Sequence, residues 1–271
     1  MGNLLYSDLK RILKDKLLLV IALITALLAV IRPILSWALL HNMDKEIAST
    51  VLNGKTYFFS AFHLGDTLSL VVTILFAVIL FKDFSHGTIR NKIVAGYTRT
   101  TIFFSTFLAG LIAIFTVMLL FALLTLGVSL TLFPYQQDPF GWKDLWYLLG
   151  SVGLEANLYL FVAALVAWIS TGSKGTGSVV LKYMCVNAVI SFGSEILTQA
   201  IQTLELQGNQ ASSLKVLRLI RNFDVFHHAS MIGSGTTYET KTLVYMIAVP
   251  LALTAITLFL GEWRFRKSDV K

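Results

Sequence analysis

Long apolar stretches alternate with short polar segments along the whole chain. A helix of about 20 apolar residues is long enough to cross the hydrocarbon core of a bilayer. Lipid offers no hydrogen-bond partners to an open backbone, so we expect these stretches to be helical. The alternating pattern of a membrane barrel strand is absent. The pattern predicts six membrane-spanning helices, at about residues 17–40, 64–81, 101–133, 145–170, 178–200 and 242–261.

The third of these stretches is longer than an upright crossing requires. A helix rises about 1.5 Å per residue, and the hydrocarbon core is about 30 Å thick. Residues 101–133 are still too few for two spans joined by a turn. We therefore expect one helix that tilts, protrudes or bends, with Gly110 and Gly127 as the candidate bending points.

The first 16 residues have an amphipathic pattern. Apolar residues recur at helical spacing with basic residues between them, which is typical of a helix in the membrane interface. The alternative is a cytoplasmic extension of the first span. The apolar stretch from Leu17 is longer than the core of a signal peptide, which predicts a retained first span. The apolar positions are Leu4, Leu5, Leu9, Ile12 and Leu13.

The composition excludes a water-soluble globule. Hydrophobic residues make up 56% of the 271 positions and charged residues only 14%, whereas soluble domains carry about 25% charged residues. The net charge is +7. In a membrane protein, Lys and Arg residues mostly mark cytoplasmic loops and contact anionic lipid head groups, so this charge does not by itself indicate nucleic-acid binding. We therefore predict one all-α integral membrane domain over residues 1–271.

The distribution of basic residues predicts the orientation. If the N-terminus is inside, the inner segments hold 14 of the 22 Lys and Arg residues and the outer segments hold the other 8. This bias predicts that both termini are cytoplasmic. The longest outer segment is then 201–241, in which "SLKVLRLIRNFDVF" has the pattern of a helix lying on the outer leaflet.

Charged residues inside membrane spans are functional candidates by default. The candidates are Arg32, Glu155 and Glu195, and Glu155 is the deepest. Glu155 either handles substrate or protons, or forms a structural pair, for example with Arg32. The chain has no phosphate-binding loop of the G-x-x-x-x-G-K-[ST] type. The adjacent residues His227 and His228 do not share a helical face, so we predict no metal site and no cofactor bound by this chain.

A short polar segment between the second and third stretches, "KDFSHGTIRNKIVAGYTRTTIFFS", contains a second helical pattern. Thr88 is a candidate N-cap and Gly96 a candidate C′ residue. Ile89 and Ile93 share one face, and the other faces carry Arg90, Asn91 and Lys92. A two-turn helix needs a partner surface to be stable. Two interpretations remain open: a helix that fits a groove of a soluble protein, or a basic turn that only anchors the topology.

This segment resembles the inner loop of type-2 ABC exporter permeases, especially the short six-span forms of Gram-positive bacteria. The family pattern is an acidic residue, Gly-Thr, a short basic helix and an Arg before the next span. The acidic residue is often Glu in the family, and a Pro or Ser often precedes the Arg, where this chain has Gly96, Tyr97 and Thr98. The matching positions are Asp83, Gly87, Thr88, Arg90, Asn91, Lys92 and Arg99.

The resemblance implies that this segment is a coupling helix that docks on a separate ATPase subunit, which binds ATP and Mg. Ile89 and Ile93 would make its apolar contact, and Arg90, Lys92 and Arg99 would contact the ATPase or lipid head groups. The resemblance further implies two ATPase copies, a second permease copy or paralogue, and a bacterial cytoplasmic membrane. Typical substrates of similar permeases are lipophilic drugs and antibiotic peptides of the bacteriocin or lantibiotic class.

Two other classes of function remain as alternatives. A membrane-embedded enzyme would need paired carboxylates or histidines facing each other across spans, and only Glu155 lies clearly deep. A non-transporting sensor or scaffold would recruit a soluble partner without moving a substrate. We expect a transport subunit and not an enzyme, and an adjacent ATPase gene would discriminate between these classes.

Overall fold

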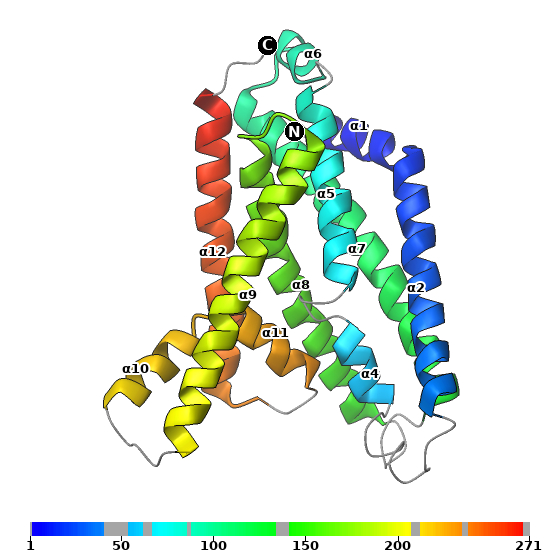
Figure 1. The fold of residues 1–271 in the computed structure, drawn as a ribbon. Helices are drawn as coiled ribbons and strands as arrows, with labels where there is room; N and C mark the ends of the chain where they lie inside the picture. Colours follow the sequence, from blue (N-terminus) through cyan, green and yellow to red (C-terminus); the bar gives the residue numbers. More distant parts are fainter. Residues whose placement is uncertain are drawn as a thin grey trace.

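The computed structural model describes residues 2–40, 54–61, 67–85, 88–133, 141–206, 212–234 and 238–267, and all regular structure in these ranges is helical. The all-helical class predicted from the pattern is thus confirmed for the described residues. The helices, shown in Figure 1, are α1 (Gly2–Leu13), α2 (Lys16–Leu40), α4 (Gly54–Ala61), α5 (Thr67–Ser85), α6 (Thr88–Val94), α7 (Arg99–Leu132), α8 (Trp142–Ser170), α9 (Thr176–Leu206), α10 (Ser212–Arg221), α11 (Val225–Gly233) and α12 (Thr240–Lys267).

Five helices within these ranges are long and apolar enough to cross a membrane: α2, α7, α8, α9 and α12. This number is one fewer than the sequence pattern predicts. The helix at the position of the predicted second span is α5, whose apolar part, Val71–Lys82, is shorter than the other five. Residues 64–66 of that predicted span lie outside the described residues.

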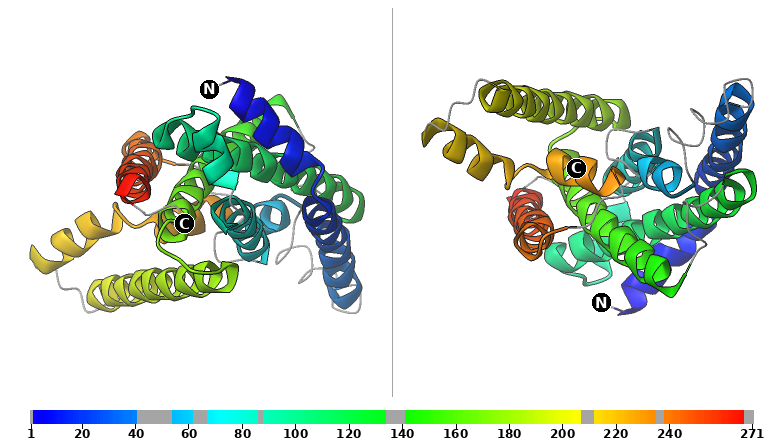
Figure 2. Two further views of the ribbon diagram at one scale, coloured as in Figure 1. Left: turned by 90° about the horizontal axis from the view of Figure 1, so that it is seen from above. Right: turned by 90° about the horizontal axis from the view of Figure 1, so that it is seen from below.

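The helices form a bundle with two different ends. The helices α1 and α6 lie at one end together with the C-terminal end of α12, whereas α4, α10 and α11 lie toward the other end (Figure 1). Helix α8 packs against α12, α5, α9 and α11, and α7 packs against α2 and α1. Seen along the bundle, α2 and α10 lie at opposite edges (Figure 2). The N-terminal helix and the short helix α6 thus lie close to one another.

The core is rich in aromatic side chains. Phe58 and Phe59 of the short helix α4 are buried, and Phe59 packs edge-on against Tyr147 of α8, with ring centroids 5.6 Å apart. The ring of Phe76 on α5 lies against Gly110 of α7, where a Cβ atom would come within 2.5 Å of its Cε2 atom. Helix α7 is one uninterrupted helix of 34 residues and runs obliquely to α12 (Figure 1). Gly110 therefore allows close packing between α5 and α7.

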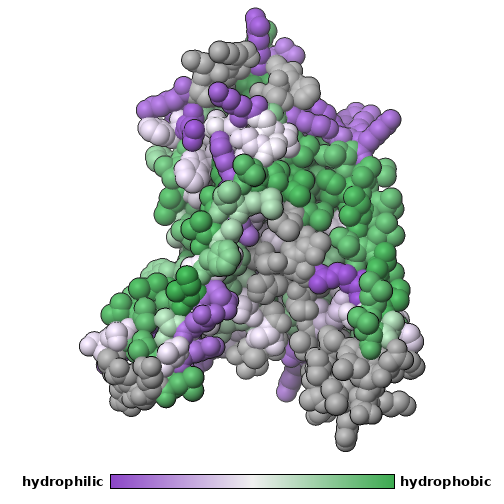
Figure 3. Space-filling view, viewed as in Figure 1, coloured by the Kyte–Doolittle hydropathy of each residue, from purple (hydrophilic) through white to green (hydrophobic). Residues whose placement is uncertain are grey.

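The surface has an apolar middle and a polar end. Figure 3 shows apolar residues across the middle of the face viewed, and hydrophilic residues gathered at the end that holds α1 and α6. Large exposed apolar side chains lie on several of the long helices, for example Leu27 on α2, Phe192 on α9 and Phe259 on α12. This distribution is that of a protein whose middle faces lipid.

Candidate functional site

Helix α6 begins at Thr88 and is closed by Gly96. The N–H of Gly96 donates to the carbonyl of Ile93 (2.9 Å), and the N–H of Tyr97 donates to the carbonyl of Lys92 (3.1 Å). This pair of bonds is a Schellman motif, which requires a left-handed residue at C′. Gly96 has φ of 90°, so its predicted role as the C′ residue is confirmed. Gly87 and the side chain of Asp83, also part of the predicted site, lie outside the described residues.

The two isoleucines of α6 face their own chain. Ile89 is only 3% exposed and belongs to the main apolar core, in which Leu4 of α1 also lies, and Ile93 packs against that core while partly exposed. Ile89 is thus covered by its own chain while Ile93 keeps an exposed part, and the expected apolar contact of this pair with an ATPase stays a prediction. The partner surface that a two-turn helix needs comes from this chain itself. The residues that α6 exposes are Arg90, Asn91 and Val94, and Val94 is 81% exposed.

Lys92 also points inward. Its ammonium Nζ lies 2.8 Å from Oδ1 of Asp8 on α1, and its side chain is only 11% exposed. Lys92 Nζ further donates to Thr106 Oγ1 on α7 at 3.4 Å. We expected Lys92 to contact an ATPase or lipid head groups, and the structure places it instead in a buried ion pair. A lysine side chain suits such a position because its methylene groups pack against apolar neighbours while its ammonium group binds a carboxylate.

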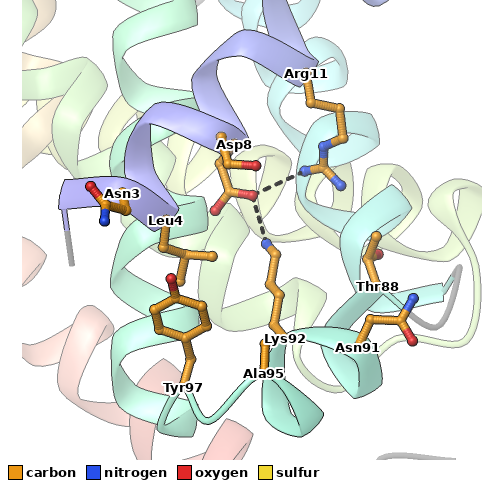
Figure 4. Close-up of a pocket in the computed structure, with 10 residues that line it drawn as sticks. Asn3, Leu4, Asp8, Arg11, Thr88, Asn91, Lys92, Ala95 and Tyr97 are labelled. Carbon is orange, nitrogen blue, oxygen red and sulfur yellow. Dashed lines mark ion pairs between the residues drawn. The ribbon is translucent and has the colours of Figure 1, made fainter.

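Asp8 is the centre of this cluster and is 2% exposed. Its Oδ2 accepts a hydrogen bond from Ser105 Oγ of α7 at 2.8 Å, and Arg11 lies 3.7 Å from its Oδ1 on the next turn of α1. Figure 4 shows Lys92 reaching toward Asp8 from one side and Arg11 from the other. One carboxylate thus joins α1, α6 and α7, and losing one partner of a buried pair costs about 3–5 kcal/mol.

Asp8 was missed by sequence reasoning, although its position carries a signal. Leu4, Asp8 and Ile12 are four residues apart and lie on one face of α1, and all three are buried. A carboxylate in the middle of an apolar face needs a cationic partner. The apolar side of α1 that we expected to rest on lipid therefore packs partly on the bundle, while Tyr6 and Leu13 remain exposed.

A cavity of about 320 Å³ opens between α1 and α6, beside the Asp8–Lys92 pair. Its apolar wall is formed by Leu4, Ala95 and the ring of Tyr97. Polar side chains from both helices line the remainder: Asn3, Ser7 and Arg11 from α1, and Thr88 and Asn91 from α6. Figure 4 labels all of these residues except Ser7 and shows them around the ion pair.

Arg99, the last residue of the predicted motif, binds the end of α12. Its Nη1 donates to the carbonyl oxygen of Arg266 at 2.8 Å. One residue later, Thr100 Oγ1 donates to Oε1 of Glu262 at 2.7 Å. A cation at a helix C-terminus is favourable because the last carbonyls carry partial negative charge. The first turn of α7 is thereby tied to the last turns of α12.

The corner between α1 and α2 is tied to α5 by a second ion pair. Lys82 Nζ lies 2.5 Å from Asp15 Oδ2, and the N–H of Leu17 donates to Asp15 Oδ1 at 3.0 Å. Partial burial acts to raise the pKa of Asp15, but the bonds from Lys82 and Leu17 outweigh it and leave this pKa below its ordinary value. Asp15 therefore stays charged and holds the corner at neutral pH.

The intramembrane candidates are placed on three helices. Glu155 on α8 is 1% exposed, and neither of its carboxylate oxygens has a hydrogen-bond partner among the described residues. The suggested pair with Arg32 of α2 is thus not formed. Glu195 on α9 is exposed, with Gln199 Nε2 3.5 Å from its Oε1. The structure therefore makes Glu155 a buried polar group and Glu195 a surface one.

Glu155 belongs to a polar stripe that sequence reasoning also missed. Tyr147, Ser151 and Glu155 are four residues apart, so they lie on one face of α8. Ser151 is buried and its Oγ has no partner among the described residues, while Tyr147 donates to Tyr238 at 3.3 Å. The four-residue spacing of polar side chains in an apolar stretch was the available signal.

No cluster of three or more metal-ligating residues occurs within the described ranges. His227 and His228 lie in α11 at the opposite end of the bundle from the Asp8 cluster. Asp224 serves as the N-cap of that helix, accepting a hydrogen bond from the N–H of Phe226 at 2.9 Å. The acidic residue beside the histidines thus has a structural role.

The described part of the chain defines an all-helical protein with five helices long and apolar enough to span a membrane. Residues 18–271 match the family described as "Protein of unknown function (DUF2705)", and the chain belongs to that family. No curated protein matches the chain at a significant level.

Proposed function

We propose that this chain is the membrane-spanning permease subunit of an ATP-driven ABC exporter in a bacterial cytoplasmic membrane. A separate ATPase chain, present in two copies, would bind ATP and Mg, and a second permease copy or paralogue would complete the transporter. The substrate would be a lipophilic drug or an antibiotic peptide of the bacteriocin or lantibiotic class. The proposal begins from the resemblance of residues 82–105 to the inner loop of such permeases.

The observation that supports it most is the construction of α6. This helix is capped by Gly96 and held to α1 and α7 by the Asp8–Lys92 cluster. A basic turn that only anchors topology does not need a buried ion pair. A helix that transmits force does, because it must move together with the spans to which it is attached. Its exposed side, with Arg90 and Val94, is the side available to an ATPase.

We further propose six spans with both termini inside, α5 being the second span. Its 19 residues correspond to about 28 Å at the helical rise per residue. Figure 1 shows α2, α7, α8, α9 and α12 running between the two ends of the bundle, and α5 running from the end that holds α1 and α6 toward the middle. Five crossings would leave α1 and the end of α12 on opposite sides of the membrane, and these two lie at the same end of the bundle.

Copurification tests the proposal. The double variant Arg90→Glu with Val94→Asp changes the exposed side of α6, and we expect it to reduce recovery of an ABC ATPase at least tenfold. A tenfold change in association constant corresponds to about 1.4 kcal/mol, a small part of what an interface supplies. The matched control is Lys215→Glu with Val216→Asp, the same chemical changes on exposed residues of α10 at the other end of the bundle.

Two outcomes would contradict the proposal. The first is purification of the native chain without any ATPase. The second is equal recovery of the ATPase with both double variants. A sensor or scaffold would retain the ATPase, but proteoliposomes containing the complex would then move no substrate when ATP is added. A membrane-embedded enzyme would be indicated by substrate turnover in the absence of the ATPase.

A further inference from the structure

The cavity lies between α1 and α6, the two helices at the hydrophilic end of the bundle (Figures 1 and 3). Helix α1 runs across the end of the bundle, at a steep angle to α2, which starts three residues after α1 ends (Figure 1). One side of α1 packs on the bundle through Leu4 and Ile12, while Tyr6 and Leu13 are exposed. Exposed apolar residues on a helix in this orientation favour a position in the interface. The cavity beside α1 then opens among lipid head groups.

The electrostatics of this end favour an anion. Segments 1–16 and 81–99 together carry eight Lys and Arg and three Asp residues, a net charge of +5. Asp8 lines the cavity, but Lys92 and Arg11 compensate its charge, and Asp15 is paired with Lys82. Juxtamembrane basic segments attract anionic lipids with about 1 kcal/mol per Lys or Arg near the surface.

The side chains around the cavity are suited to a phosphate. The guanidinium of Arg11, the amides of Asn3 and Asn91 and the hydroxyl of Ser7 are all hydrogen-bond donors, and they come from two helices that face each other. Arginine binds phosphate oxygens in a bidentate manner. The volume of about 320 Å³ is at the lower end for small-molecule sites, and the apolar wall of Leu4 and Tyr97 suits a glycerol backbone.

We propose that this cavity binds the phosphate head group of an anionic phospholipid of the adjacent leaflet. The lipid would then bridge α1 and α6, and the position of α6 would depend on the lipid as well as on the Asp8–Lys92 pair. This proposal requires membrane insertion but no ATPase, so it goes beyond the proposed function and can fail independently of it.

Native mass spectrometry of the purified chain tests the site. Dioleoylphosphatidylglycerol and dioleoylphosphatidylcholine are titrated separately, and the dissociation constant of the tightest bound lipid is measured. We expect a preference for phosphatidylglycerol that Arg11→Gln weakens about fivefold and that Arg11→Lys partly restores. The matched control is Lys10→Gln, which removes one charge from the neighbouring exposed position outside the cavity and should leave the tightest binding unchanged.

Three results would overturn the proposal. The first is no preference for the anionic lipid, and the second is equal weakening by Arg11→Gln and Lys10→Gln, which indicates a diffuse basic surface. The third is displacement of the lipid by millimolar inorganic phosphate, which indicates a site for a free phosphate. Circular dichroism melting of Arg11→Gln checks its fold, and we expect little change because Asp8 keeps its bonds to Lys92 and Ser105.

Discussion

The packing of α1, α6 and α7 against one another depends on the carboxylate of Asp8. A buried ion pair is weak evidence for stability, because desolvating both charges offsets much of their attraction. Its geometry is nevertheless specific: an amine on α6 and a hydroxyl on α7 must both reach the same side chain of α1. The pair therefore fixes how α6 is placed more than it adds to the free energy of unfolding.

This argument predicts a non-additive pair of mutations. Asp8→Leu alone leaves the ammonium of Lys92 buried without its partner, and we expect it to lower the free energy of unfolding by about 3–5 kcal/mol. Asp8→Leu combined with Lys92→Met removes both charges and should cost much less. Thermal unfolding of the detergent-solubilised single and double variants measures the coupling. Additive losses would show that the two residues act independently.

Glu155 presents the opposite case, a buried carboxylate without a partner among the described residues. A buried polar group that makes no hydrogen bond destabilises a fold by about 1–3 kcal/mol. We therefore expect Glu155→Leu to raise the melting temperature while it lowers transport, because a residue kept at such a cost needs a functional reason. Glu155→Gln isolates the role of the charge in transport assays. A lower melting temperature for Glu155→Leu would instead indicate a structural role.

At the scale of elements, the helical pattern identified which residues share a face but not what covers that face. Ile89 and Ile93 were correctly placed on one side of α6, and Gly96 was correctly predicted as its C′ residue, because both follow from local geometry. The covering surface is long-range information: the core that buries Ile89 also contains Leu4 of α1, more than 70 residues earlier in the chain. For the same reason, the sequence did not reveal the contact of Arg99 with the end of α12.

The packing of α5 on α7 gives a prediction with an internal control. Gly110→Ala would place a Cβ atom 2.5 Å from the buried ring of Phe76, and overpacking of this kind costs about 1–3 kcal/mol. Gly127 lies on the same helix, and a Cβ atom added there would meet no atom within 4 Å. Gly127→Ala should therefore be neutral or stabilising by about 0.5–1 kcal/mol, the usual difference in helix preference.

Melting temperatures of the two glycine variants in the same detergent check this prediction. A loss of stability in both variants would mean that α7 needs flexibility at its glycines, as a bending helix would. A loss at Gly110 alone would show that this glycine serves close packing of α5 on α7.

For the whole molecule, the order of the helices constrains how the chain sits in a membrane. The sequence predicted the all-helical class from composition and stretch length alone, because lipid leaves few alternatives for a chain with so little charge. It could not predict that α4, with its buried phenylalanines, packs at the end of the bundle opposite α1 and α6, because the contact of Phe59 with Tyr147 of α8 joins residues far apart in the sequence.

Cysteine labelling in intact cells tests the proposed orientation of the whole chain. Cys185→Ser first removes the native cysteine, and single cysteines are then introduced as Ser213→Cys on α10 and Val94→Cys on α6, both at exposed positions. With both termini inside, a membrane-impermeant maleimide should label the α10 position in intact cells and the α6 position only after lysis. The two sites lie toward opposite ends of the bundle (Figure 1), so the expected contrast is large. Labelling of α6 but not α10 in intact cells would indicate the reversed orientation. The cavity between α1 and α6 would then face the outside, and a cytoplasmic ATPase could not reach α6.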